Sequence, residues 1–247
     1  MEKQGRRPGP SAEWGDWRKR NTLGASARET AYRIIRDKII YLDLKPGEAL
    51  SDRVLAEELE MSRTPVREAL IILSTTNMVV LRPQSGTFVA PIDVKRMAAE
   101  QFLRYVLEKE ILTLTCQHMD EPLKQRYREN LYLYHFYRYD SSESLDREKR
   151  LLELDNEFHR IAFASVGRED NFFYIMDTMQ HIERLRSLSL TTMTDDHVYS
   201  DHQRIVDALS EGDLKTALYW LEIHMNRYQE SIKGIQAQFP QYFSLEV

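Results

Sequence analysis

One stretch constrains this chain more than any other: the helix restart at Ser62-Arg63-Thr64-Pro65. Proline is tolerated in the first turn of a helix, because the N–H that it lacks would have no partner there. Apolar residues follow at helical spacing, so one face of the new helix should be buried: Val66, Ala69, Leu70 and Leu73. Upstream, Ser51 can cap a shorter helix, whose expected inward residues are Val54, Leu55, Leu59 and Met61. The two segments predict a helix-turn-helix.

The first turn of the second helix exposes two arginines and a threonine, Arg63, Thr64 and Arg67. Long cationic side chains in this position can enter the major groove of DNA and reach O6 and N7 of guanine. Thr64 can contact a phosphate or a thymine methyl group. The alternative is a solvated helix start with ordinary surface arginines, and the segment that follows makes this alternative less favoured.

That segment contains two short runs rich in β-branched residues, 78–82 and 87–90, on either side of Pro83-Gln84-Ser85-Gly86. Such runs around a Pro/Gly turn predict a β-hairpin. An earlier helix is expected from Ser26 or Ala27 to Leu42, and Lys45-Pro46-Gly47 ends it with a turn. Three helices followed by a hairpin make a winged helix-turn-helix.

The charge is divided unevenly along the chain. The net charge of the whole chain is −5. Residues 1–95 hold 16 Lys and Arg against 13 Asp and Glu, a net charge of +3, and the remainder holds 18 against 26, a net charge of −8. This division suits a DNA-reading head on a body that does not touch DNA.

Composition excludes several other classes of protein. No apolar run approaches the roughly 20 residues that a membrane span requires, so no membrane partner is expected. The start of the sequence has no apolar signal-peptide core, and the single Cys116 cannot form an intramolecular disulfide. We therefore expect a cytoplasmic protein.

The chain is expected to divide into three parts: a mobile N-terminal arm (1–25), a winged helix-turn-helix domain (26–92) and an all-helical domain (93–240). Amphipathic helices are expected near 95–119, 121–140, 144–166, 170–190, 197–211 and 213–238. Joined by short loops, they would form a six-helix antiparallel bundle. The predicted fold class is therefore mainly α.

The helical half contains a constellation of histidines and one aspartate. Asp155 and His159 are four residues apart on a predicted helix, so they project from one face. His202 and His224 lie on the fifth and sixth helices of this half. Three imidazoles and a carboxylate suit a divalent cation such as Zn²⁺, with Mn²⁺ or Ni²⁺ as alternatives. Each histidine could equally be an ordinary core or surface residue, and His197 could replace His202.

The ordered series 50–56, 62–70 and the Ser85-Gly86 turn resembles the DNA-binding domain of the GntR family of bacterial transcription regulators. The similarity covers about residues 27–92. It implies that Arg53, Arg63 and Arg67 contact DNA, assisted by Thr64 and by the wing tip at Ser85 and Gly86.

The helical half resembles the ligand-sensing FCD domain of the FadR-like branch of this family. The pattern Asp155 to His159, then His202 before Ile205-Val206-Asp207-Ala208-Leu209, then His224 fills all four metal-ligand positions of that domain. Arg104, followed by Leu107-Glu108, is similar to the arginine that pairs with a ligand carboxylate. A surface ion pair of Arg104 with Glu100 or Glu108 is the alternative.

The residues suit a DNA-binding regulator better than an enzyme, and a structural or adaptor protein would leave both sets of motifs unexplained. The leading hypothesis is a metabolite-responsive repressor, not an enzyme, that acts as a homodimer on a palindromic DNA operator and binds a divalent metal and a small carboxylate effector. The second is a metal-dependent hydrolase-like enzyme that uses Asp155, His159, His202 and His224. Against it, no general base is identifiable beside the cluster, since Glu157 should point to a different face of its helix. No catalytic residue is therefore assigned.

Overall fold

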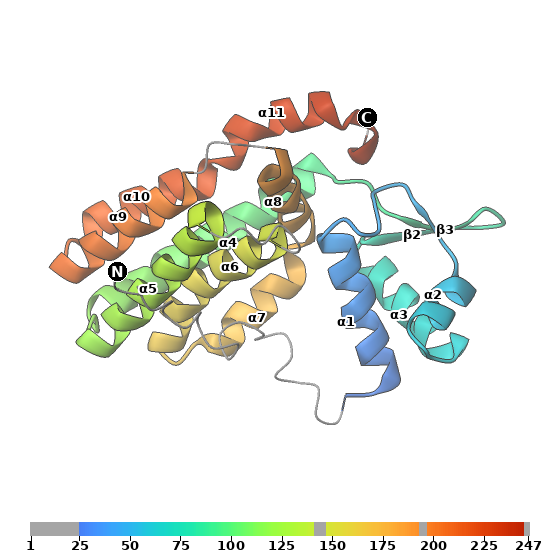
Figure 1. The fold of residues 1–247 in the computed structure, drawn as a ribbon, viewed down its shortest axis with the longest axis horizontal. Coiled ribbons are helices and arrows are strands. Elements are labelled where there is room, and N and C mark those ends of the chain that lie inside the picture. Colours follow the sequence, from blue (N-terminus) through green and yellow to red (C-terminus); the bar gives the residue numbers. More distant parts are fainter. Residues whose placement is uncertain (1–24, 141–146, 193–196, 245–247) are drawn as a thin grey trace, which may run out of the picture.

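In the computed structural model a small head carrying a β-sheet is joined to a larger body of helices (Figure 1). The structure describes residues 25–140, 147–192 and 197–244. Below, the head means the elements from α1 to β3, and the bundle means the elements from α4 to α11. The expected mainly α fold class is confirmed. Residues 1–24 of the expected N-terminal arm lie outside the described residues.

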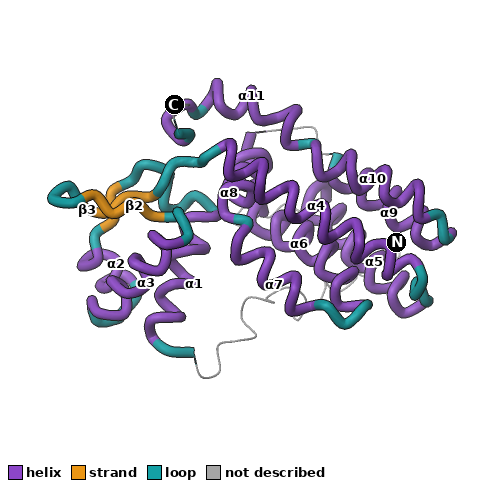
Figure 2. The backbone as a smooth tube through the Cα atoms, turned by 180° about the vertical axis from the view of Figure 1, so that it is seen from behind, coloured by secondary structure: helices purple, strands orange, loops and turns teal. Residues whose placement is uncertain are grey.

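The head contains helices packed on a small antiparallel sheet. Its elements are α1 (Ala27–Ile40), β1 (Ala49–Leu50), α2 (Asp52–Glu58), α3 (Arg63–Thr75), β2 (Val79–Arg82) and β3 (Gly86–Val89). The strand order is β1-β3-β2, and Arg82 pairs with Gly86 at the hairpin end. The wing formed by β2 and β3 points away from the bundle in both Figure 1 and Figure 2. The two-residue β1 was not expected, because it is too short to show an alternating pattern.

Local sequence signals fix the ends of the head helices. Ser26 and Glu29 form a capping box at the start of α1, which satisfies backbone N–H groups that have no partner in the helix. The side chain of Ser51 accepts the N–H of Val54 at the start of α2, as expected. In α3 the expected apolar face is buried.

One expectation for the head is wrong. Val54 was expected to face inward, but its side chain is 51% exposed. Helix α2 has only seven residues and buries Leu55 and Ala56. A helix of two turns offers one narrow inward face, and Val54 lies outside it.

Four residues, 90–93, separate the wing from the bundle. Its elements are α4 (Val94–Cys116), α5 (Glu121–His135), a π-helical turn η2 (Phe136–Asp140), α6 (Arg147–Ser165), α7 (Glu169–Thr178), α8 (Gln180–Thr192), α9 (Val198–Glu211), α10 (Leu214–Asn226), α11 (Tyr228–Gln238) and a 3₁₀ turn η3 (Pro240–Tyr242). A continuous apolar core joins these helices, with Phe158, Phe163 and Phe172 among its members.

Two of the six expected helices are each divided in two. The segment expected at 170–190 breaks at Met179, and the one expected at 213–238 bends at Arg227. Glu100 of α4 accepts the N–H groups of His181 and Ile182 and so caps the start of α8. Arg227 makes a two-pronged ion pair with Asp201 of α9. Both breaks are supported by contacts with distant residues, which helical periodicity does not reveal.

The head and the bundle share buried contacts. Helix α1 packs against α8, and Arg36 of α1 donates to the carbonyl of Met176 in α7 at 2.9 Å. Leu152 of α6 is a buried member of the apolar core of the head, and Leu190 of α8 packs against the same core. Among the described helices, none is long and apolar enough to cross a membrane.

Candidate functional site

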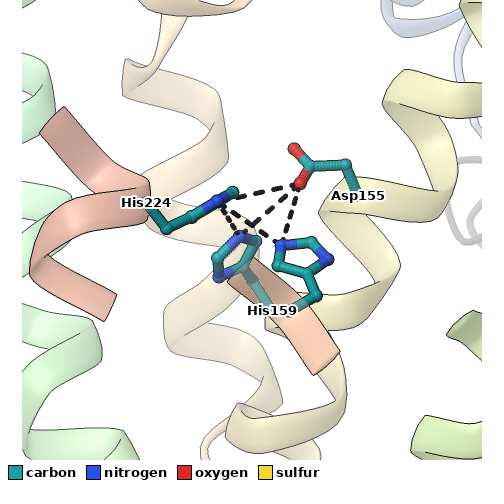
Figure 3. Close-up of side chains that lie close together, drawn as sticks. Asp155, His159 and His224 are labelled. Atoms are coloured by element: carbon teal, nitrogen blue, oxygen red, sulfur yellow. Dashed lines mark hydrogen bonds and ion pairs between the residues drawn. The ribbon is translucent and has the colours of Figure 1, made fainter. Parts of the chain in front are cut away.

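Four potential metal ligands converge in the middle of the bundle. Asp155 and His159 come from α6, His202 from α9 and His224 from α10. Figure 3 shows Asp155, His159 and His224 pointing toward one another. The three histidine Nε2 atoms and Asp155 Oδ1 all lie within 4.8 Å of one another. His197 begins α9 and lies outside this group.

The separations fit a single divalent cation. The Nε2 atom of His224 lies 3.2 Å from that of His159 and 3.4 Å from that of His202. Asp155 Oδ1 lies 3.2 Å from Nε2 of His202 and 3.8 Å from the other two. Ligand atoms at about 2.1 Å from a tetrahedral metal would be about 3.4 Å apart. Asp155 Oδ1 has no hydrogen-bond partner among the described residues, so it is available as a ligand atom.

Glu108 of α4 sets the orientation of His159. Nδ1 of His159 donates to Oε2 of Glu108 at 2.5 Å, because a carboxylate oxygen can only accept. This leaves the lone pair on Nε2, which faces the other ligands. Arg104 in turn donates from Nε to Oε1 of Glu108 at 2.6 Å. Arg104 thus pairs with Glu108, one of the two partners named in the alternative, but this ion pair is buried and does not lie on the surface.

The pKa values of these buried groups favour an ionised Glu108 and neutral histidines. Burial opposes the charge of Glu108, but His159 and Arg104 beside it lower the pKa of its carboxyl to about 2. Burial lowers the pKa of His159, an effect that Glu108 opposes. Burial and the neighbouring histidines hold the pKa of His202 and His224 well below 6.5. Neutral imidazoles are the form that binds a metal.

A cavity of about 150 Å³ adjoins the cluster. Asp155, His224 and Arg104 lie in its wall, together with aliphatic side chains of α6 and α8 such as Leu152 and Leu185. The Nη2 atom of Arg104 has no hydrogen-bond partner within the described part of the chain. The cavity wall therefore combines two of the four potential ligands with a buried guanidinium.

In the head, the first turn of α3 exposes Arg63, Thr64 and Arg67 as expected. The side chains of Arg63 and Arg67 are 60% and 70% exposed, and both reach Asp52 of α2, at 2.9 and 3.7 Å. Asp52 thus holds the two guanidinium groups side by side. Arg53 is also exposed and pairs with Glu57 at 3.5 Å.

The wing tip of the head is also exposed. Ser85 and Gly86 are both exposed. Gly86 has a φ of +113°, a backbone conformation that residues other than glycine rarely adopt. Arg82 lies over the ring of Phe88 at 4.9 Å and stiffens the hairpin.

Sequence reasoning missed two residues that hold the ligands. Glu108 was considered only as a partner of Arg104, and its contact with His159 was not foreseen. Arg186 of α8 was not singled out, yet it forms an ion pair with Asp155. A polar residue at a position that periodicity places inside a bundle is the signal that could have identified Glu108.

Two family profiles match the chain. The profile of "Bacterial regulatory proteins, gntR family" matches residues 27–89, and the profile of the FCD domain matches residues 101–227. The first match covers the helix-turn-helix and the wing, and the second covers the four-ligand cluster and Arg104.

Relatives match along most of the chain. A protein of Streptomyces ambofaciens, described as an uncharacterized HTH-type transcriptional regulator in an unstable DNA locus, is 31% identical over 91% of this chain and 93% of its own length. The HTH-type transcriptional repressor RspR of Escherichia coli is 24% identical over 87% of this chain and 92% of its own length.

Solved structures share the fold. E. coli McbR/YncC has a TM-score of 0.70 at 19% identity and covers 87% of this chain and 99% of its own. A GntR regulator from Rhodococcus sp. RHA1 has a TM-score of 0.61 at 23% identity and covers 85% of this chain and 99% of its own.

The neutral histidines predict how stability depends on pH once metal has been removed with a chelator. The folded pKa of His202 lies below the unfolded value of 6.5, so the unfolded state binds more protons between these values. The free energy of unfolding should therefore be unaffected by this group above pH 6.5 and should fall as the pH drops below it, by about 1 kcal/mol at pH 5.5. Urea unfolding at pH 7.5 and 5.5 measures this, and His202→Asn should show a smaller decline. Equal declines in both proteins would contradict the assignment.

Proposed function

Because this chain belongs to the GntR family of bacterial transcription regulators and contains an FCD domain, we propose that it is a repressor controlled by a metal and a small carboxylate. It is a DNA-binding regulator, and its relatives are regulators rather than enzymes. The observation that carries the proposal is the four-ligand cluster, two of whose members line a cavity together with the buried Arg104. The same chain carries an exposed arginine turn and an exposed wing tip.

The head and the bundle would have separate roles. Residues 26–92 would form the DNA-binding domain and residues 93–240 the sensing domain. The matched profiles, over residues 27–89 and 101–227, support this division. The repressor role is supported by the E. coli relative described as a transcriptional repressor. The protein would act in the cytoplasm, where bacterial DNA is accessible.

Arg63, Thr64 and Arg67 enter the major groove, and Arg53 with the wing tip at Ser85 and Gly86 contacts the neighbouring backbone. Support comes from the exposure of these side chains and from the arrangement of both arginines around Asp52. One winged helix reads only a few base pairs. A homodimer on a palindromic operator doubles the site and reaches useful specificity.

Helix α4 carries the surface that suits a second copy. Phe102, Leu103 and Val106 are 66%, 58% and 50% exposed on its outer face. A contiguous apolar patch of this kind marks an interaction site. In an antiparallel pair of α4 helices centred between Phe102 and Leu103, Glu110 of one copy lies opposite the basic end of the other, at Lys95 and Arg96.

The four-ligand cluster holds a divalent cation, and Zn²⁺ suits three imidazoles and one carboxylate best, with Mn²⁺ and Ni²⁺ as alternatives. The bound cation would supply a Lewis-acidic position for an effector oxygen. The ligand set alone would also permit a hydrolase, but Glu157 pairs with Arg160 and is not beside the cluster.

The effector is a small organic acid whose carboxylate takes the position between the cation and Arg104. The unpartnered Nη2 atom of Arg104 supports this role. A cavity near 150 Å³ is about the size that holds benzene in a protein core, so the acid has few heavy atoms. A thermal-shift screen of organic acids with metal-loaded protein identifies it, since a ligand of the folded state raises the melting temperature.

DNA binding should depend on the arginine turn. Arg63→Ala or Arg67→Ala should lower specific affinity by about 1–3 kcal/mol, because each removes a groove contact while leaving the core unchanged. The operator, selected from a random DNA library with the parent protein, is titrated by fluorescence anisotropy. Arg128→Ala, an exposed arginine of α5, is the matched control and should bind as the parent does. Parent-like affinity in both head variants would remove the groove assignment.

Metal should copurify with the protein and depend on the cluster. His159→Ala or His224→Ala should lower the metal content sharply and reduce the melting temperature of the metal-loaded protein, because metal binding contributes to folding stability. Elemental analysis of purified protein measures this. His118→Ala changes an exposed histidine outside the cluster and should retain parent-like metal content. Unchanged metal in the cluster variants would exclude this site.

Arg104→Lys should impair the response to the effector while DNA binding without effector persists. The lysine ammonium is a compact point charge and cannot reproduce the planar fork with which the guanidinium pairs with Glu108 and with a ligand carboxylate. The loss should approach the whole coupling energy, typically about 1–3 kcal/mol. Operator titrations with and without the acid found by the screen measure it, with Arg128→Lys as the control. A parent-like response in Arg104→Lys would place the carboxylate elsewhere.

A further inference from the structure

We propose that two buried side chains of α8, His181 and Arg184, transmit the state of the metal cavity to the DNA-binding head. The proposal rests on the proposed function and names the route by which that site is read out. The route follows from three sets of contacts: α8 with the cavity, α8 with the segment between head and bundle, and α8 with α4.

One side of α8 faces the metal cavity. Ile182, Leu185, Arg186 and Ser189 lie in the cavity wall, at the i, i+3, i+4 and i+7 spacing of a single helix face. Arg186 also forms an ion pair with the metal ligand Asp155. Arg186 pairs with Oδ2 of Asp155, whereas Oδ1 faces the histidines. A cation bound at Oδ1 would draw negative charge from the same carboxylate and weaken its ion pair with Arg186.

Residues on the adjacent side of α8 form hydrogen bonds with the backbone of residues 90–93, called the linker below. Nη1 of Arg184 donates to the carbonyl of Ala90 at 2.6 Å. Nδ1 of His181 accepts the backbone N–H of Asp93 at 3.0 Å and a second donor, Nη2 of Arg184, at 2.9 Å. Arg184 is fully buried, and a buried guanidinium is tolerated only where its hydrogen bonds are made. The linker is thus tied to α8 at both ends.

The start of α8 is tied to α4 through Glu100, which accepts the N–H groups of His181 and Ile182. Glu100 lies one turn before Arg104 on α4, and Arg104 lies in the cavity wall. Figure 1 and Figure 2 both place α8 on the side of the bundle that faces the head, and α1 packs against it. A shift of α8 therefore reaches the linker through side chains that are already in contact.

These are positioning residues, because neither contacts DNA or the cluster. Two variants of His181 distinguish loss of the hydrogen-bond acceptor from a change in side-chain size. His181→Leu removes the acceptor, whereas His181→Asn keeps an oxygen near the position of Nδ1. Arg184→Met removes both donors while keeping a similar stem. Arg128→Met on α5 is the matched control.

Hydrogen–deuterium exchange of the full chain, stripped of metal and then given Zn²⁺ alone as the probe, tests the route. In the parent, Zn²⁺ should slow exchange in the α6, α9 and α10 peptides and also change exchange in the peptides covering the wing and residues 90–93. In His181→Leu and Arg184→Met the response around the cluster should persist and the response of the linker and wing should be lost. His181→Asn and Arg128→Met should respond as the parent does.

The outcomes distinguish the two levels of the proposal. If Zn²⁺ protects nothing in the parent, the proposed metal site fails and the transmission route fails with it. If Zn²⁺ protects the cluster peptides but leaves the linker unchanged, or if His181→Leu responds like the parent, the route alone is wrong. Should Arg184→Met not fold, as judged by circular dichroism, the His181→Leu and His181→Asn pair decides.

Discussion

The arrangement of the ligand cluster and of Arg104 depends on the hydrogen bonds that the Glu108 carboxylate accepts. It is almost fully buried and accepts from both Arg104 and His159. Removing any one of the three would leave a buried polar group without its partner, which costs more than an exposed ion pair gains. The contact fixes which nitrogen of His159 faces the other ligands and, at the same time, which part of Arg104 remains available at the cavity.

Helix α4 is inverted with respect to an ordinary amphipathic helix. Its buried residues include Gln101, Arg104 and Glu108, whereas Phe102, Leu103 and Val106 are exposed. An isolated bundle gains nothing from this arrangement, because it buries charge and exposes hydrocarbon. A polar inner face is explained by a binding site, and an apolar outer face is explained by a second protein surface. The same helix therefore brings together the site and the proposed dimer contact.

The sequence predicted the parts of the structure that depend on neighbours along the chain. The Ser51 cap, the buried face of α3 and the hairpin follow from local rules. The four-ligand set followed from a resemblance to a family that is now shown. The break at Met179 and the cap provided by Glu100 could not be predicted, because they depend on a residue about 80 positions away. Neither could the partnership of Glu108 with His159, since periodicity alone places apolar residues, not carboxylates, on an inner face.

The uneven charge of the chain indicates which part of it faces DNA. The half of the chain after residue 95 carries a net charge of −8, so DNA is repelled by the bundle and is approached by the head. In the proposed homodimer, regulation would therefore act on how the two heads are presented to DNA. Only four residues, 90–93, separate the last wing strand from helix α4. The same helix also carries Glu100, Arg104 and the apolar outer face. A change at the cavity that moves α8 against α4 therefore alters the linker and the proposed dimer contact together, which is how a small ligand can change the spacing of two reading heads.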